Sequence, residues 1–144
     1  MPRKVPPDLL HGVRNRAENL CEYCHTSERW QYVRFTVDHI VPLADGGDDN
    51  FDNLALACFH CNRRKSARQV AFDPQTGQEV EIFNPRVHRW SDHFKWSDDG
   101  LLIVPFTSIG RATSSLLDLN RERVLPIRGA DVLVGRHPPS TDRR

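Results

Sequence analysis

The sequence predicts a small α+β protein, and three observations carry that prediction. Apolar residues recur at helical spacing between residues 9 and 20. Aromatic and β-branched residues dominate residues 29–41, as they do in strands. Four cysteines form two CxxC pairs, at 21–24 and 58–61. With 144 residues, we expect one compact core with attached peripheral segments.

The elements expected in the first half follow from local composition, with caps and breakers at their ends. In chain order they are a helix over 9–20 capped by Asp8, a strand over 29–41 ended by Pro42, a glycine-containing loop over 44–52, a short apolar element over 54–57, and a basic helix over 62–70.

The second half predicts a hairpin, with strands over 94–96 and 101–106 around a Ser-Asp-Asp-Gly turn, and then a helix over 109–120. Trp90 and Trp96 are expected to be core residues, because the area that they bury would dominate so small a core. The polar residues 135–144 predict a disordered tail. We therefore expect a core domain over 1–72, an extension over 73–134 packed on it, and this tail.

The N-terminus does not look like a targeting segment. Residues 1–7 contain Arg3, Lys4 and three prolines, and no apolar run follows them. The longest apolar stretch, residues 101–104, is far too short to span a bilayer. These features predict a soluble cytoplasmic protein with no membrane segment, in a compartment where thiols stay reduced.

The two CxxC pairs predict a structural zinc site. Each two-residue spacer forms a tight turn that puts two thiolates on one ion, so Cys21, Cys24, Cys58 and Cys61 together make a tetrahedral four-sulfur site. Residues 25–57 separate the pairs, which is more than the roughly 15–20 residues of a simple zinc ribbon. A substantial insert is therefore expected between the two turns.

Other interpretations of the cysteines stay open. The four thiols form two disulfides in an oxidising compartment, and a dithiol redox motif uses a single CxxC in a βαβ context. His25 and His60 flank the cysteines and are alternative zinc ligands, although four cysteines already complete the site.

The insert contains the residues that suggest an activity. It carries Val37-Asp38-His39-Ile40-Val41-Pro42-Leu43, then Gly46-Gly47, then Asn53-Leu54, and the second cysteine pair continues as Cys61-Asn62-Arg63-Arg64-Lys65. In this order and over roughly residues 21–65, the sequence resembles the HNH endonucleases of the ββα-metal class. The resemblance implies a small ββα-metal core closed by the zinc site, with the N-terminal helix and the C-terminal hairpin and helix attached to it.

The same resemblance implies a role for each matching residue. His39 takes the place of the general base, and Asn53 that of the middle Asn, which fixes the base's loop or its imidazole. Asp38 and Asn62 take the places of the ligands to a catalytic divalent ion. The third motif residue is Asn62 rather than the histidine of the family name, as in other CxxCN variants.

The chemistry agrees with these roles. An imidazole with a pKa of about 6.5 accepts a proton from water at neutral pH, and oxygen ligands such as Asp38 and Asn62 suit Mg²⁺ or Mn²⁺. Successive side chains of a strand point to opposite faces, however, so Asp38 and His39 enter one site only if the strand bends or ends there.

The formal charge of +1 requires any phosphate-binding surface to come from local clusters. The cluster nearest the motif is Arg63, Arg64, Lys65 and Arg68. We therefore expect a metal-dependent endonuclease that hydrolyses DNA, with RNA as an alternative substrate. The residues of the C-terminal part indicate no function of their own, and one idea is that its hairpin and Arg111 widen the DNA footprint. The competing interpretation is a non-catalytic zinc module that binds nucleic acid or protein.

Overall fold

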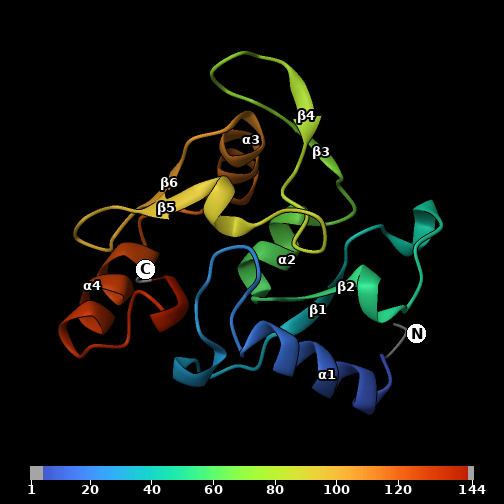
Figure 1. Cartoon of the computed structure of the whole chain (residues 1–144), viewed down its shortest axis with the longest axis horizontal. Helices are drawn as coiled ribbons and strands as arrows, with labels where there is room; N and C mark the ends of the chain where they lie inside the picture. The colour runs from blue at the N-terminus through green and yellow to red at the C-terminus, as the bar shows by residue number, and fades with distance from the viewer. Residues whose placement is uncertain (1–4, 143–144) are drawn as a thin grey trace. The chain divides into compact units, whose positions relative to one another are not determined.

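The computed structural model describes residues 5–142, while residues 1–4 and 143–144 lie outside the description. The chain forms two units (Figure 1). The first unit is Met1–Gln69 with Asn84–Val87, and the second is Val70–Phe83 with His88–Arg144. In the described part, no helix is both long and apolar enough to cross a membrane.

The first unit is built on one antiparallel strand pair between two helices. Its elements are α1 (Pro7–Ala17), β1 (Thr36–His39), β2 (Leu54–Ala57) and α2 (Phe59–Lys65). The strand register runs from Thr36 opposite Ala57 to His39 opposite Leu54. Helix α1 lies against β2 and α2 contacts β1, which together with the hairpin gives the ββα order of elements (Figure 1).

The core of this unit depends on β2 and the helix that covers it. All four residues of β2 are buried, and Leu54 and Leu56 have no exposed surface. Val13 of α1 and Tyr23 are equally inaccessible. Removing these apolar side chains from water is the main stabilising contribution to so small a unit.

Strand β1 is shorter than the predicted strand over 29–41. It begins at Thr36, because its partner β2 ends opposite it at Ala57, where the chain turns into α2. Without a partner strand, residues 29–34 lie exposed, starting with the short 3-10 helix Glu28–Trp30. Their aromatic and β-branched content indicated a strand, but no ladder is available to them.

Both helices of the first unit begin at a residue that differs from the prediction. Pro6 occupies the N-cap of α1, and Asp8 lies in the first turn, where its charge favours the helix dipole. Helix α2 begins at Phe59 instead of residue 62, because the Cys58 sulfur accepts a hydrogen bond from the Cys61 amide and caps the helix. The helix ends at Lys65 instead of residue 70, so Arg63, Arg64 and Lys65 fall in its last turn and Arg68 lies beyond it.

The second unit contains two hairpins and two helices. The elements are β3 (Val70–Phe72), β4 (Glu79–Glu81), β5 (Phe94–Trp96), β6 (Ile103–Pro105), α3 (Ser108–Leu117) and α4 (Val124–Leu133). The β5–β6 hairpin and α3 confirm the prediction, whereas the β3–β4 hairpin and α4 were not expected. Helix α3 packs on β3, β4 and β6, and Ala112 joins Ala71 and Ile82 in the core.

Trp90 and Trp96 are half-buried rather than the core residues that were predicted. Their rings lie 5.8 Å apart, and the Trp96 indole donates to Asp142 at 3.0 Å. Asp142 belongs to a 3-10 helix over Ser140–Asp142. This helix lies within the segment 135–144 that was predicted to be a disordered tail, and residues 143 and 144 of that segment lie outside the described residues. Arg111 donates two hydrogen bonds to the buried Asp73 carboxylate, which ties α3 to the β3–β4 turn.

Candidate active site and metal centre

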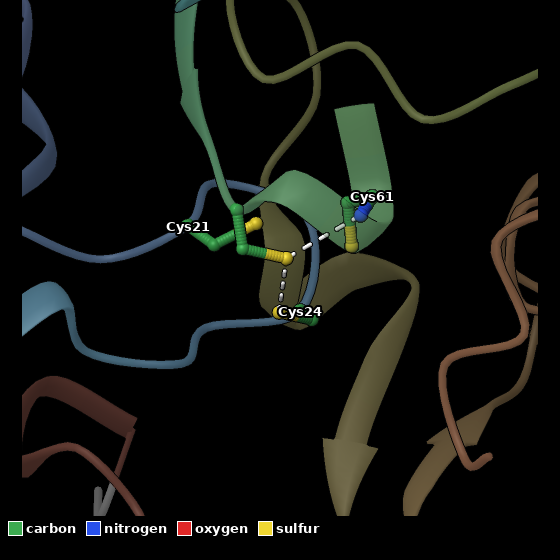
Figure 2. A group of neighbouring side chains, drawn as sticks. Cys21, Cys24 and Cys61 are labelled. Carbon is green, nitrogen blue, oxygen red and sulfur yellow. Dashed lines mark hydrogen bonds between the residues drawn. The ribbon is translucent and has the colours of Figure 1, made fainter. Parts of the chain in front are cut away.

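The four cysteines meet at one buried point. Cys21 and Cys24 come from the turn after α1, and Cys58 and Cys61 come from the start of α2, with all four sulfur atoms within 4.8 Å of one another. Figure 2 shows Cys21, Cys24 and Cys61 gathered around this point from the two chain segments. Among the described residues, the potential metal-binding group contains these cysteines and no histidine.

The cluster has the size of a zinc site. With Zn–S bonds of about 2.3 Å, two sulfurs of a tetrahedral site lie about 3.8 Å apart. The sulfurs of Cys24 and Cys58 lie 3.8 Å apart, and none of the four cysteines forms a disulfide. The four-cysteine cluster is therefore compatible with structural zinc, and the disulfide interpretation does not apply to this structure.

The electrostatics of the cluster also favour a cation. Hydrogen bonding by Cys21, and then by Cys58 and Cys61, lowers the pKa of the Cys24 thiol well below its usual value. Burial raises the pKa of Cys21 well above its usual value, and hydrogen bonding to Cys21 does the same for Cys61. A divalent ion would offset the charge of four buried thiolates.

The segment between β1 and β2 is closed by Asn53. Its side chain accepts from the Val41 amide at 2.9 Å and donates to the carbonyls of Val41 and Asp48, at 3.0 Å each. Gly47 passes so close that a Cβ there would lie 1.8 Å from the Val41 carbonyl oxygen. Asn53 therefore fixes the backbone of the loop that follows His39.

His39 lies at the end of β1 and meets an acid from this loop. Its Nε2 is 2.8 Å from Asp49 Oδ1, and both side chains are mostly buried but still reach solvent. Because Asn53 holds the neighbouring Asp48, Asp49 is brought to the imidazole by the same loop closure. Nothing in the motif spacing singled out Asp49 from Asp45, Asp48 and Asp52.

Asp38 points into the core, away from His39. Its carboxylate accepts from the Tyr23 hydroxyl at 2.6 Å and pairs with the Lys65 ammonium at 3.1 Å. Burial raises the pKa of the Asp38 carboxyl above its usual value, although the Lys65 ammonium opposes this shift, and burial also keeps the Tyr23 pKa well above its usual value. A divalent ion at Asp38 would lie against a buried ammonium, so this arrangement does not fit Asp38 as a direct ligand.

Strand β1 ends at His39, as one form of the expectation required, but this end does not bring the Asp38 and His39 side chains together. The strand register stays regular through His39, and the two side chains have different partners. Two adjacent residues of a regular strand face opposite sides, so the regularity of β1 explains the separation.

The basic residues of α2 also differ in burial. Lys65 is buried, and its ammonium also lies 3.4 Å from the His39 and Ile40 carbonyl oxygens, so it is not part of the predicted phosphate-binding surface. Arg63, Arg64 and Arg68 are exposed. Asn62 is half-buried and precedes Lys65 by one helical turn.

Comparison with known families bears directly on this segment. The family model for HNH endonuclease matches residues 21–68, which include both cysteine pairs, β1, β2 and α2. This segment belongs to the HNH family. Comparison with the curated proteins gives no match. The HNH assignment supports a nuclease-type enzyme acting on nucleic acid, and it confirms the family that the motif order indicated.

Removing one zinc ligand should unfold the HNH segment. We expect Cys58→Ser to lower bound zinc from one ion per chain to well below one and to reduce the far-ultraviolet circular dichroism signal, because the metal's binding energy is folding energy. His60→Ala is the matched control, and it should retain one zinc ion in the same chelator-release assay. Loss of zinc in the His60 variant instead would show that the site is not a four-sulfur site.

Lys65 and Arg63 should behave in opposite ways when truncated. Lys65→Ala leaves the buried Asp38 carboxylate without its cation, and we expect a loss of about 3 to 5 kcal/mol in the free energy of unfolding. Arg63→Ala removes an exposed cation and should change that free energy by less than about 0.5 kcal/mol. Urea unfolding in zinc buffer measures both, and equal midpoints would contradict the burial of Lys65.

Proposed function

We propose that the protein is a divalent-metal-dependent endonuclease that hydrolyses DNA phosphodiester bonds, with His39 as the general base. The observation that carries this proposal is the position of the His39 imidazole. It lies in the HNH segment at the end of β1, in reach of solvent, and Asp49 orients it while Asn53 fixes its loop.

The pairing with Asp49 suggests which nitrogen acts. When the Asp49 carboxylate accepts a hydrogen bond from Nε2, the neutral imidazole carries its lone pair on Nδ1. In this proposal Nδ1 takes a proton from water as the water oxygen attacks phosphorus. The bond from phosphorus to the 3′ oxygen then breaks, and the leaving oxygen takes a proton from solvent. Asp49 fixes the tautomer and does not itself transfer a proton.

A divalent ion such as Mg²⁺ or Mn²⁺ would offset the charge that develops on the scissile phosphate. Of the two residues that the resemblance assigns to this ion, Asn62 is half-buried and carries an amide oxygen of the kind that such an ion prefers. Asp38 takes part only if its carboxylate gives up the Lys65 ammonium. We therefore propose Asn62 as the primary ligand and Asp38 as a conditional one.

The substrate proposal rests on the exposed arginines of α2 and the residues after it. Arg63 and Arg68 are exposed and supply the cations for phosphate contacts. DNA is the proposed substrate, and RNA cleavage by the same chemistry is the alternative outcome of a substrate comparison. The cytoplasmic location predicted from the sequence stays a prediction.

A second candidate function is a zinc module that binds nucleic acid or protein without cleaving it. The occupied Asp38 carboxylate favours this candidate, since a buried ion pair with Lys65 stabilises a fold and does not require an ion. Cleavage assays separate the two candidates.

Plasmid cleavage tests the proposed activity. We expect zinc-loaded protein to convert supercoiled plasmid to nicked or linear forms with Mg²⁺ or Mn²⁺. His39→Ala should lower the single-turnover rate at least 100-fold, because it removes the base. Asn62→Ala should raise the Mn²⁺ concentration needed for half-maximal rate. Gel electrophoresis measures the rates.

The control for this assay is His11→Ala, which alters an exposed histidine of α1. It should cut plasmid as the unaltered protein does. An intact plasmid across several divalent ions, or equal cutting by the His39 variant, would contradict the nuclease proposal and favour the non-catalytic module.

Asp49 gives a separate test of the base. Asp49→Asn should lower kcat at least tenfold and leave KM within twofold, because an amide no longer enforces the Nε2–H tautomer. The matched control is Asp52→Asn, an exposed acid of the same loop, which should change neither value. If both variants have the same kcat as the parent protein, Asp49 has no positioning role.

A further inference from the structure

The loop before β1 has an unusual surface. Residues 29–34 are all exposed, and they read Arg-Trp-Gln-Tyr-Val-Arg. The side chain of Tyr32 is fully accessible, Val33 is 66% exposed and Trp30 is 46% exposed. Exposed aromatic side chains in such density are expected where a ligand covers them, since solvent exposure of apolar area is unfavourable.

The base of this loop is held by buried polar contacts. The Glu28 carboxylate pairs with Arg14 of α1 at 3.0 Å and also accepts from the Phe35 amide. Arg14 in turn donates to the Phe35 carbonyl at 3.0 Å. Glu28 and Phe35, which flank the six exposed residues, are therefore fixed to each other and to α1. The loop presents its aromatic side chains from an anchored base.

The charge of the loop selects a kind of ligand. Arg29 and Arg34 enclose the aromatic residues, and no acidic residue lies between them. An acid that borders the loop, Glu28, is already paired with Arg14. Proteins bind single-stranded nucleic acid with positive side chains that contact its phosphates and with aromatic side chains that stack on its bases. Such stacking tolerates any sequence, because every base has a face that stacks.

The loop leads into β1, the strand that carries the proposed base. Arg34 precedes His39 by five residues, which span at most about 17 Å at roughly 3.4 Å per residue. At roughly 3.4 Å per stacked nucleotide, this corresponds to at most about five nucleotides between Arg34 and His39. One DNA strand thus has room to reach both the loop and the imidazole.

We propose that residues 29–34 form a stacking platform for unpaired bases of the nucleic-acid substrate, with its Arg34 edge at most about five nucleotides from the bond that His39 cleaves. This proposal rests on the proposed nuclease function and adds a substrate class to it, namely DNA with a single-stranded region. Tyr32 is the residue that touches the base, and Arg29 and Arg34 contact the adjoining phosphates.

Binding without cleavage tests the platform. The full chain with His39→Ala, loaded with zinc, is titrated against a fluorescein-labelled single-stranded 20-mer and a blunt duplex of the same sequence, by anisotropy. Adding Tyr32→Ala should weaken single-strand binding by about fivefold to 150-fold, as loss of one base–aromatic stack does, and leave duplex binding within twofold. Tyr32→Phe keeps the ring and should bind like the parent.

A matched control and a salt series sharpen the result. Phe72→Ala removes a comparably exposed aromatic ring elsewhere on the surface and should change neither affinity. Arg34→Ala should reduce the salt dependence of single-strand binding by about one phosphate contact, while Tyr32→Ala leaves the slope unchanged.

Unchanged single-strand affinity in the Tyr32→Ala protein would overturn the platform. An equal loss of affinity for both DNAs would also overturn it, because the loop would then contact the sugar-phosphate backbone instead of unpaired bases. In the first case the exposed loop is left as a candidate surface for a protein partner. Plasmid cleavage by the unaltered protein reports on the nuclease proposal independently, so the failure of one proposal is distinguishable from the failure of the other.

Discussion

Four buried sulfur atoms, held within 4.8 Å of one another, are the constraint on which the first unit depends. They join the turn after α1 to the start of α2, and the β1–β2 hairpin lies between these segments in the chain. Cys58 ends β2 and caps α2 with the same sulfur. Four thiolates buried together without a cation would be unfavourable. A metal ion bound by all four sulfurs would therefore hold the β1–β2 strand pair and α2 in their relative positions.

A second interaction depends on this cluster. Tyr23 lies between Cys21 and Cys24 in sequence, so the cysteine turn brings its hydroxyl to the Asp38 carboxylate. Lys65 reaches the same carboxylate from the end of α2. Burying an ion pair costs desolvation, and this one is compensated by the tyrosine and by two carbonyl oxygens near Lys65. Because Asp38 is fixed inward, the period of two in a strand turns His39 outward.

Much of this arrangement was predictable, and the exceptions have physical causes. The cysteine cluster, β2 and the β5–β6 hairpin followed from spacing and composition, and the motif order indicated the HNH family. Helix α4 did not, because Pro126 and Gly129 are poor helix formers. The β3–β4 hairpin has strands of three residues, too short to show a period, and Glu79 and Glu81 give it no strand composition.

In the site, the partners were harder to predict than the motif residues. Lys65 belongs to a run of basic residues, and its burial follows only from the helix register that the Cys58 cap sets. Asp49 is one of four acids between residues 45 and 52. Its selection requires the loop to close over Gly47, where any larger residue would overlap the Val41 carbonyl.

That closure links the loop to the chemistry of the base. An imidazole accepts a proton at one nitrogen only when the other is held as a donor, and Asp49 is the acceptor that holds it. Asn53 positions Asp49 through the Asp48 carbonyl, and it also holds Val41, two residues after His39. One amide side chain therefore fixes both sides of the His39–Asp49 pair. A general base needs such a frame, because its orientation and tautomer have to be set before water arrives.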